Sequence, residues 1–462
     1  MPSCAHSDRI GSAWFEKNDG WFKALIFCHK RQCDEGAAEE YAMSWISWIC
    51  FGICFLIALS TLRRGADVLS PSRVFGFIWS FSIGLTDLKF SALQGAWNLE
   101  SWLLLLTGIG AFLVGTLIVQ VLNLETKLLP LSTMRESLRG EKIHETRLFW
   151  FICLSVAVYS ASYLVIFLVR GFLPIFVVGT KISRVEFFIY GLGLLINSTA
   201  FIIFFTLLYY LYVRGKRVKK TILAILSVLA VGSYFLLLQR FQIVMAVVIS
   251  FALLYYATNF IRVRTVLLFS VTVIAFFYWI TLLRYRHLEL VTMFLYSASK
   301  MKFPTQFAAL TEPYMYVVMN LENFSRAVNR LDHHTYGYFS FDFIAAITGL
   351  KYWISDYFGI DRTPYLFSSY NTYTAFWSFY RDFGVGGLVL IPLALGFSVA
   401  ALYHRMRNGP TIKNVTAYGV MVFVMRISFF VFPIAFIWFE YNMLALYWIL
   451  RWTIMPRAET VE

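Results

Sequence analysis

Charged side chains are scarce in this chain of 462 residues: Asp, Glu, Lys and Arg together make up 14%, against 59% hydrophobic residues. The mean hydropathy is +0.66. A soluble domain covers its core with charged and polar side chains, and this chain has too few of them for its length. The shortage excludes an ordinary soluble protein and indicates a polytopic helical membrane protein.

Motifs for nucleotide and metal chemistry are also missing. The Gly-rich phosphate loop that ends in Lys-Ser or Lys-Thr is absent, which disfavours nucleotide-dependent chemistry. Asp-x-Asp does not occur, and no Cys/His spacing suits zinc. We therefore expect neither a cofactor nor a metal. Three of the six cysteines precede residue 42 and three lie in apolar runs, so disulfides do not staple the long polar segment 284–384.

Long apolar runs dominate what is present. Runs able to cross about 30 Å of hydrocarbon predict eleven transmembrane helices. They cover residues 43–62, 74–93, 101–122, 148–169, 187–212, 221–239, 241–260, 265–283, 385–403, 414–432 and 436–453. The least regular is 74–93, where Asp87 and Lys89 shorten the apolar stretch.

The basic residues of the short loops predict the orientation, because Lys and Arg are retained on the cytoplasmic face. Most of them fall in alternate loops, namely those after the first, third, fifth, seventh and ninth runs. These loops and the C-terminus are therefore expected in the cytoplasm, and the N-terminus and segment 284–384 in the periplasm. The formal charge of +14 reflects this bias and the outer arginines, so it does not imply a nucleic-acid partner.

One membrane domain with an external cap is the predicted organisation, since no repeat or Pro/Gly-rich linker is evident. Residues 1–42 form an extension of mixed charge. Either this extension is disordered or translation starts at Met43. Residues 43–283 hold the first eight helices, 284–384 form a periplasmic catalytic loop, and 385–462 hold the last three helices and the cytoplasmic C-terminus. Within the loop, apolar residues from Val317 to Leu331 follow a helical spacing from Thr311 onward, which predicts an amphipathic helix on the outer leaflet or over the bundle.

Arginines are the most frequent charged residues expected on the outer side. A guanidinium presents a fork of donors that matches phosphate oxygens and stays charged when partly buried. Arg240 stands out because it ends one apolar run and the next begins immediately, so we expect its charge to face the protein interior. The alternative is an arginine that extends to the membrane interface. The outer arginines are Arg170, Arg184, Arg240, Arg284, Arg286, Arg326, Arg330, Arg362 and Arg381.

Aromatic and acid–base residues accompany these arginines. The cluster Tyr336, Tyr338, Phe339, Phe341 and Phe343 suits either sugar rings or the aromatic belt at the membrane interface. Candidates for a general base that deprotonates a hydroxyl are His287, His333, His334, Glu289, Asp332, Asp342, Asp356, Asp361 and Asp382. We favour His334 and Asp382, which lie beside the most distinctive local sequences. Asp382 could instead form an ion pair with Arg381, and Asn371 and Thr374 could be helix caps.

Short motifs make the chain resemble a known family. They are Leu69-Ser-Pro-Ser-Arg-Val-Phe-Gly-Phe-Ile-Trp79, Arg170-Gly-Phe-Leu-Pro-Ile-Phe176, Arg240, Tyr336-Gly-Tyr-Phe-Ser-Phe341, and Asn371-Thr-Tyr-Thr followed by Tyr380-Arg-Asp-Phe-Gly384. Together they cover roughly residues 60 to 440, and the last is the most specific. The chain resembles the bacterial oligosaccharide repeat-unit polymerases, the Wzy or O-antigen polymerase family.

The resemblance implies an inner-membrane enzyme with an all-α fold of the integral-membrane glycosyltransferase type. It would join repeat units carried on undecaprenyl pyrophosphate at the periplasmic face, without metal or nucleotide. Arg240, Arg284 and Arg286 would bind the diphosphate, with Arg170 or Arg184 as a further partner. His334 and Asp382 would be the catalytic candidates. Residues that bind glycan or shape the site would be Tyr336, Tyr338, Asn371, Thr374, Tyr380 and Arg381.

Two rival functions stay open. An O-antigen ligase shares the lipid-linked donor and the large outer loop, but transfers finished glycan to lipid A. A polysaccharide transporter or flippase would show inverted-repeat halves and polar breaks at the midplane, and neither is evident in the sequence. Whether a chain-length regulator binds is also open.

Overall fold

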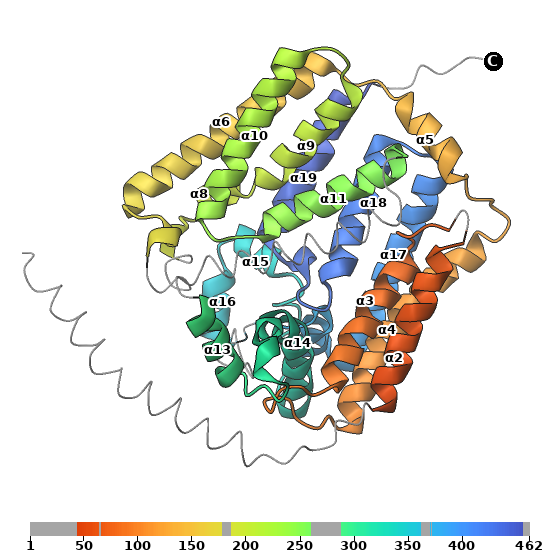
Figure 1. Cartoon of the computed structure of the whole chain (residues 1–462), viewed down its shortest axis with the longest axis vertical. Coiled ribbons are helices and arrows are strands. Elements are labelled where there is room, and N and C mark those ends of the chain that lie inside the picture. Colours follow the sequence, from red (N-terminus) through yellow and green to blue (C-terminus); the bar gives the residue numbers. More distant parts are fainter. Residues whose placement is uncertain are drawn as a thin grey trace, which may run out of the picture. The chain divides into compact units, whose positions relative to one another are not determined.

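The structure is a computed structural model, which describes residues 44–63, 66–177, 186–259, 288–361, 370 and 372–455. The apolar segments of these residues fold into helices (Figure 1). The first half contains α2 (Trp45–Thr61), α3 (Pro71–Asp87), α4 (Leu99–Leu122), α5 (Leu131–Arg139), α6 (Glu145–Arg170), η1 (Pro174–Phe176), α8 (Leu192–Ile196), α9 (Thr199–Tyr212), α10 (Arg217–Leu236) and α11 (Phe241–Ala257). The second half contains α13 (Leu288–Ala298), η2 (Thr305–Leu310), α14 (Thr311–Arg330), α15 (Asp342–Ile347), α16 (Lys351–Tyr357), α17 (Ala375–Asn408), α18 (Ile412–Ile427), η3 (Pro433–Ala435) and α19 (Ile437–Thr453). The described residues contain no strand, which confirms the all-α prediction.

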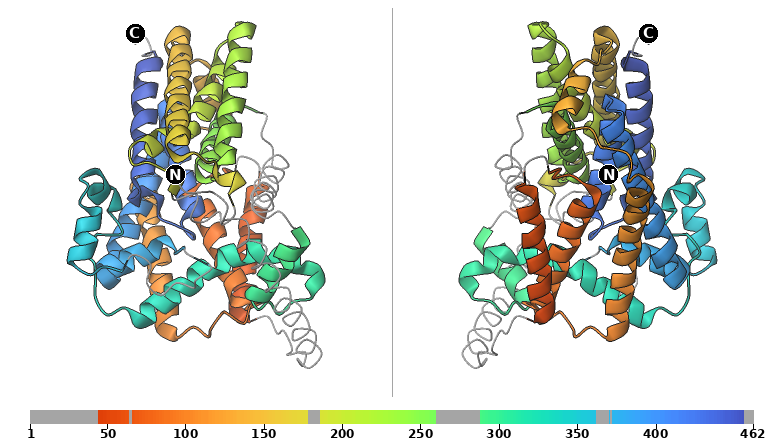
Figure 2. Two further views of the ribbon diagram at one scale, coloured as in Figure 1. Left: turned by 90° about the vertical axis from the view of Figure 1, so that its left-hand side faces the viewer. Right: turned by 90° about the vertical axis from the view of Figure 1, so that its right-hand side faces the viewer.

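The helices of Ile46–Glu462 form one unit with two groups. Helices α2, α3, α4 and α17 lie side by side in one group, and α6, α8, α9, α10, α11, α18 and α19 in the other (Figures 1 and 2). Contacts of α18 with both α11 and α17 join the groups. Helices α4 and α17 approach so closely that an added Cβ at Gly115 would lie 2.2 Å from the Leu393 carbonyl oxygen. At Gly396 it would lie 2.0 Å from the Phe112 carbonyl oxygen, so small residues make this packing possible.

Among the described residues, five helices are long and apolar enough to cross a membrane: α4, Leu192–Tyr212, α6, α10 and α17. Each predicted span except 265–283, which lies outside the described residues, overlaps a helix. The number eleven and the orientation stay predictions. The boundaries differ where local chemistry intervenes. Helix α3 runs from Pro71 to Asp87 rather than over 74–93, because proline favours the first helical turn.

The last part of the predicted catalytic loop is also helical. Helix α17 begins at Ala375 instead of near residue 385, and its helical geometry breaks at Gly384, where φ is 60° and ψ is −144°. This backbone conformation is accessible essentially to glycine alone. Gly384 therefore divides α17 into a short first segment at the outer loops and a long apolar second segment.

Helix α14 confirms the amphipathic helix expected from Thr311 onward, and it packs over α3, α4 and α17. Four of its polar residues, Asn320, Glu322, Asn323 and Ser325, are buried as well as its apolar ones. The Glu322 carboxylate accepts hydrogen bonds from the Gly95 backbone N–H at 2.9 Å and from the Trp97 indole N–H at 2.9 Å. Buried polar groups require such partners, so α14 is held to the loop between α3 and α4.

Hydrogen bonds join the loops into two groups, one at each end of the helices. At one end, Arg407 donates to the Leu129 carbonyl, Glu141 accepts from the Ile412 backbone N–H, and His144 donates its backbone N–H to Thr453. These loops are the ones predicted to be cytoplasmic. At the other end, the Ala92 backbone N–H donates to the Lys300 carbonyl, and the Lys302 N–H donates to the Phe90 carbonyl. The Ala375 N–H donates to the Ser428 carbonyl. The loops predicted to be external therefore share the second end.

Candidate functional site

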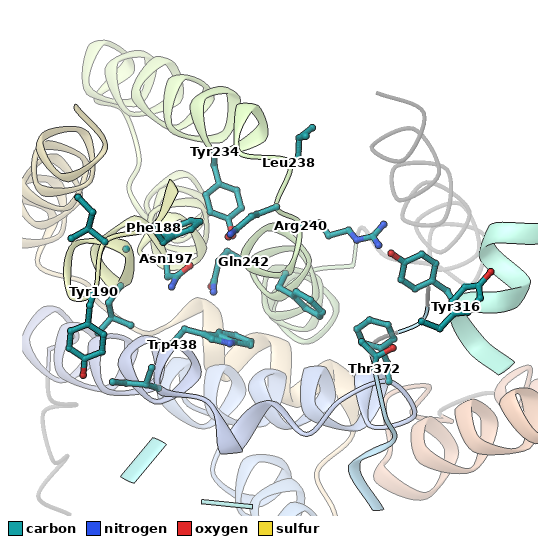
Figure 3. A pocket seen from close by; sticks show the side chains of 18 of the residues that line it. Phe188, Tyr190, Asn197, Tyr234, Leu238, Arg240, Gln242, Tyr316, Thr372 and Trp438 are labelled. Carbon is teal, nitrogen blue, oxygen red and sulfur yellow. The ribbon is translucent and has the colours of Figure 1, made fainter. Parts of the chain in front are cut away.

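A cavity of about 980 Å³ lies at the end where the predicted external loops meet. Its walls come from the segment before and within α8, the connection from α10 to α11, the first turns of α14, and the segment between α18 and α19 (Figure 3). Its polar and charged side chains are Asn197, Gln239, Arg240, Gln242, Glu312 and Thr372. Its aromatic side chains are Phe188, Tyr190, Tyr234, Phe241, Phe294, Tyr316, Tyr352, Tyr370, Phe430 and Trp438. A few polar groups in an aromatic wall are typical of a site for an organic ligand.

Among the described residues that line this cavity, Arg240 is the cationic one. Helix α10 ends at Leu236 and α11 begins at Phe241, and Leu238 turns the chain with a φ of 55°. This short reversal keeps Arg240 within the protein, where it is 7% exposed. Its guanidinium carbon lies 4.7 Å from the centre of the Tyr316 ring, within the range of a cation–π contact (Figure 3). The expectation that its charge faces the interior is confirmed.

Glu312 is a cavity residue that sequence reasoning missed. It lies on the first turn of α14, four residues before Tyr316, and residues with this spacing share a helix face. A carboxylate is therefore on the same face of α14 as the ring that holds Arg240. The spacing from Thr311 onward predicts a helix there but assigns no role to Glu312. The signal in the sequence was the i, i+4 spacing of Glu312 and Tyr316, which places both on one helix face.

Neutral amides give the cavity further hydrogen-bonding groups in fixed positions. The Gln242 side-chain oxygen accepts from Asn442 at 3.1 Å, and the Gln239 oxygen accepts from the Tyr234 hydroxyl at 3.0 Å. Each amide is thereby oriented, because one of its groups is committed to a neighbour. Such oriented amides can recognise hydroxyl groups of a ligand.

Part of the Asn371-Thr-Tyr-Thr motif borders the cavity through Tyr370 and Thr372. Two buried amides of α14 hold this segment. The Asn323 side chain donates to the carbonyl of Tyr370 at 3.1 Å and to that of Thr372 at 2.9 Å, and the Thr372 hydroxyl donates to Asn320. Helix α14 thus supplies four cavity residues, Glu312, Met315, Tyr316 and Met319, and positions two more. Asn371 itself lies outside the described residues.

Asp382 lies away from this cavity and is fully buried, with 0% exposure. Its carboxylate accepts from the Thr335 hydroxyl at 2.5 Å, from the Phe339 backbone N–H at 3.1 Å and from the Ser340 backbone N–H at 2.6 Å. With these partners and no exposure, the carboxylate is committed to segment 335–340 and is shielded from a substrate hydroxyl. The geometry favours an anchor for segment 335–340 over the predicted general base.

We expect Asp382→Asn to lower the stability of the protein by about 1–3 kcal/mol, because the amide presents a donor toward backbone N–H groups that need an acceptor. Thermal unfolding in detergent measures this effect. The matched control is Asp356→Asn, since Asp356 is exposed on α16. A folded Asp382→Asn protein with unchanged stability and no activity would instead restore the role of base.

The other predicted catalytic residue, His334, is exposed and packs beside Gly384. Its Nδ1 lies 3.2 Å from the Arg381 carbonyl oxygen, and its ring meets the Tyr380 ring edge-on. An added Cβ at Gly384 would lie 3.0 Å from Nε2 of His334, so the glycine makes room for the imidazole. Neither predicted base lines the cavity.

Other residues of the final motif, and of the motif from Tyr336 to Phe341, lie at the same junction. The Arg381 guanidinium is 4.8 Å from the Phe339 ring centre and 5.2 Å from that of Trp377. Tyr338 is buried and donates to the Lys351 carbonyl at 3.2 Å. Thr374 precedes α17 and is buried, but its hydroxyl makes no cap hydrogen bond. Tyr336 is 84% exposed. These residues therefore build the junction at the start of α17, whereas Thr372 is the described residue of the final motif that lines the cavity.

The other predicted phosphate ligands have mixed positions. Arg170 ends α6, is exposed, and donates to the carbonyl of the cavity residue Phe188 at 3.4 Å. Arg184, Arg284 and Arg286 lie outside the described residues. Arg326 is on α14 beyond the cavity, where burial and the neighbouring Arg330 lower its pKa and Glu322 opposes them. Arg240 is thus the predicted ligand that the structure brings into the cavity.

The cavity unites a guanidinium, a carboxylate, oriented amides and aromatic faces. A guanidinium binds phosphate, a carboxylate accepts a proton, and amides and rings bind sugars. Within the described ranges, no group of three or more His, Cys, Asp or Glu residues could hold a metal ion. Comparison of the chain with protein-family models, with curated proteins and with solved structures found no match.

Proposed function

We propose that this chain is a glycosyltransferase of the bacterial inner membrane that polymerises oligosaccharide repeat units at the periplasmic face. The donor is a glycan chain on undecaprenyl pyrophosphate, and the acceptor is a single repeat unit on the same carrier. The observation that carries the proposal is Arg240, buried at the outer-loop end of an apolar helical protein, in a cavity with aromatic walls. The family resemblance of the outer motifs supports the same class of function.

The reaction needs stabilisation of the leaving group, a proton acceptor and orientation of the sugars, and the cavity residues can supply all three. The acceptor hydroxyl oxygen attacks the anomeric carbon of the donor, the bond from this carbon to the diphosphate oxygen breaks, and undecaprenyl pyrophosphate leaves. Arg240 stabilises the negative charge that develops on the departing diphosphate. Glu312 takes the proton of the acceptor hydroxyl. The aromatic rings and the Gln239 and Gln242 amides orient the sugars.

Energy for the transfer comes from the bond between sugar and pyrophosphate, so the reaction consumes no nucleotide.

The size of the cavity suits this substrate: about 980 Å³ lies at the upper end of the range for small-molecule sites. That volume accommodates a diphosphate with its first sugars. The lipid tail and the distal glycan would lie outside it.

Deletion of the gene in its source strain tests the proposal. We expect single repeat units to accumulate on the lipid carrier, and surface glycan to carry one unit or to be missing. Mass spectrometry of lipid-linked glycans, with a gel of surface polysaccharide, measures both. Long lipid-linked chains that never reach the surface would identify a ligase instead. Repeat units trapped on the cytoplasmic side would identify a transporter, and unchanged glycans would contradict all three functions.

A further inference from the structure

The helical hairpin formed by α15 and α16, residues 341–358, exposes more apolar surface than a water-facing element should. Trp353 is 60% exposed, Tyr357 70% and Phe358 64%, and on α15 Ile344 is 53% and Ile347 62% exposed. Trp353 and Tyr357 lie one turn apart and their rings stack at 5.3 Å. A contiguous patch of this kind marks a surface that something covers.

Charge in the hairpin is small and internally compensated. Lys351 and Asp342 form an ion pair at 2.7 Å between the two helices. Asp356 is the other charged residue of the segment. Because the pair neutralises itself, the hairpin offers no strong field for a charged protein partner. Trp and Tyr beside aliphatic residues are the side chains that concentrate at the level of lipid headgroups.

The hairpin is continuous with a helix that is itself expected to face lipid. Helix α15 packs against α19, and α19 exposes Leu444 at 59%, Tyr447 at 54% and Trp448 at 60%. Figure 2 shows the hairpin, in cyan, at the flank of the helices rather than over their centre. The same apolar surface therefore extends from a predicted span onto the hairpin.

We infer that the α15–α16 hairpin lies in the headgroup layer of the bilayer and fixes the height of the cavity mouth there. Tyr352 of α16 and Tyr190 both line the cavity and are 62% and 76% exposed. The Tyr190 hydroxyl donates to the Ala346 carbonyl of α15 at 2.5 Å, which ties this side of the cavity to the hairpin. The second step rests on the proposed function: a lipid-linked diphosphate sits in the headgroup layer, level with this mouth.

Spin labels test the placement without any turnover. In a protein whose six cysteines are replaced by serine, the single variants Trp353→Cys and Tyr357→Cys are labelled and reconstituted into vesicles of phosphatidylethanolamine and phosphatidylglycerol. Collision rates with oxygen, which enters lipid, and with a water-soluble nickel chelate are then measured. Leu117→Cys on the exposed face of α4 is the lipid control, and Lys127→Cys in the exposed loop after α4 is the water control.

We expect the ratio of oxygen to nickel collisions at residues 353 and 357 to exceed the Lys127 control several-fold and to stay below the Leu117 control, because oxygen is enriched and the chelate depleted with depth in the bilayer. A ratio equal to that at Leu117 would place the hairpin in the hydrocarbon layer and overturn the inference. Ratios equal to that at Lys127 would overturn the inference. Immobile labels shielded from both reagents would also overturn it, since they would indicate a covering protein. As a second measurement, a fluorophore at residue 357 should be quenched by brominated lipids, and one at residue 127 should not. A result that contradicts the headgroup placement of the hairpin would not change the glycan phenotype expected of the deletion strain. The placement and the proposed function can therefore be disproved independently.

Discussion

Arg407→Leu is expected to destabilise the protein by about 3–5 kcal/mol, the cost of leaving one member of a buried ion pair without its partner. Arg407 is 6% exposed and Asp67 is 4% exposed, and their side chains meet at 2.8 Å. Asp67 also accepts from the hydroxyls of Tyr256 at 3.0 Å and Tyr403 at 2.9 Å. Loss of the guanidinium leaves the carboxylate in a buried site with only neutral donors.

Arg405→Leu is the matched control, because Arg405 lies in the same turn of α17 but is exposed. Thermal unfolding of both variants in detergent gives the comparison. The double variant Asp67→Asn with Arg407→Leu should recover part of the loss, since it removes both charges. Equal stability of the Arg407 and Arg405 variants would show that the pair does not stabilise the fold.

Local pattern accounts for the parts of the fold that were predicted correctly. The apolar runs predict helices because each run must satisfy its own backbone hydrogen bonds in lipid. The spacing from Val317 to Leu331 predicts α14 since its apolar stripe has the helical period. Burial of Arg240 followed from the short connection between two apolar runs, which leaves no chain to carry the charge into water.

Long-range pairing accounts for what the sequence did not reveal. Asp67 and Arg407 are 340 residues apart, and no local pattern marks either as the partner of the other. Asp382 was favoured as a base because it lies in the most distinctive local sequence, whereas its carboxylate accepts hydrogen bonds from segment 335–340. Glu312 resembled an ordinary helix-start residue until the fold brought Arg240 over Tyr316.

The distinctive segment from Tyr380 to Gly384 therefore does not line the candidate cavity. The motif Tyr380-Arg-Asp-Phe-Gly384 is distinctive because several of its members have demanding structural roles. Gly384 adopts a backbone conformation closed to other residues, and the Arg381 guanidinium lies against two aromatic rings. Its neighbour Thr372, which lines the cavity, reaches that position through hydrogen bonds from α14. The motif Tyr380 to Gly384 thus shapes the start of α17, and α14 holds the cavity residue Thr372.

Arg240→Lys is expected to reduce polymer formation by roughly 100- to 1,000-fold, the usual cost of losing one preorganised donor to transition-state charge. Lysine keeps the positive charge, but it lacks the planar fork that can bind two phosphate oxygens at once. It also stacks less well over Tyr316, whose ring holds the guanidinium at 4.7 Å. The defect should therefore appear in the rate of transfer at equal protein abundance, and not in folding.

Arg330→Lys provides the matched control, because Arg330 ends α14, is exposed, and does not line the cavity. Both variants are expressed in the deletion strain, and the length distribution of surface glycan is followed at matched protein levels. We expect full-length glycan with Arg330→Lys, and single units with only traces of polymer with Arg240→Lys. Glu312→Gln should resemble Arg240→Lys, since an amide cannot take the proton of the acceptor. Normal polymer with Arg240→Lys would exclude bidentate phosphate binding by this residue and move the search for the diphosphate ligand to the other outer arginines.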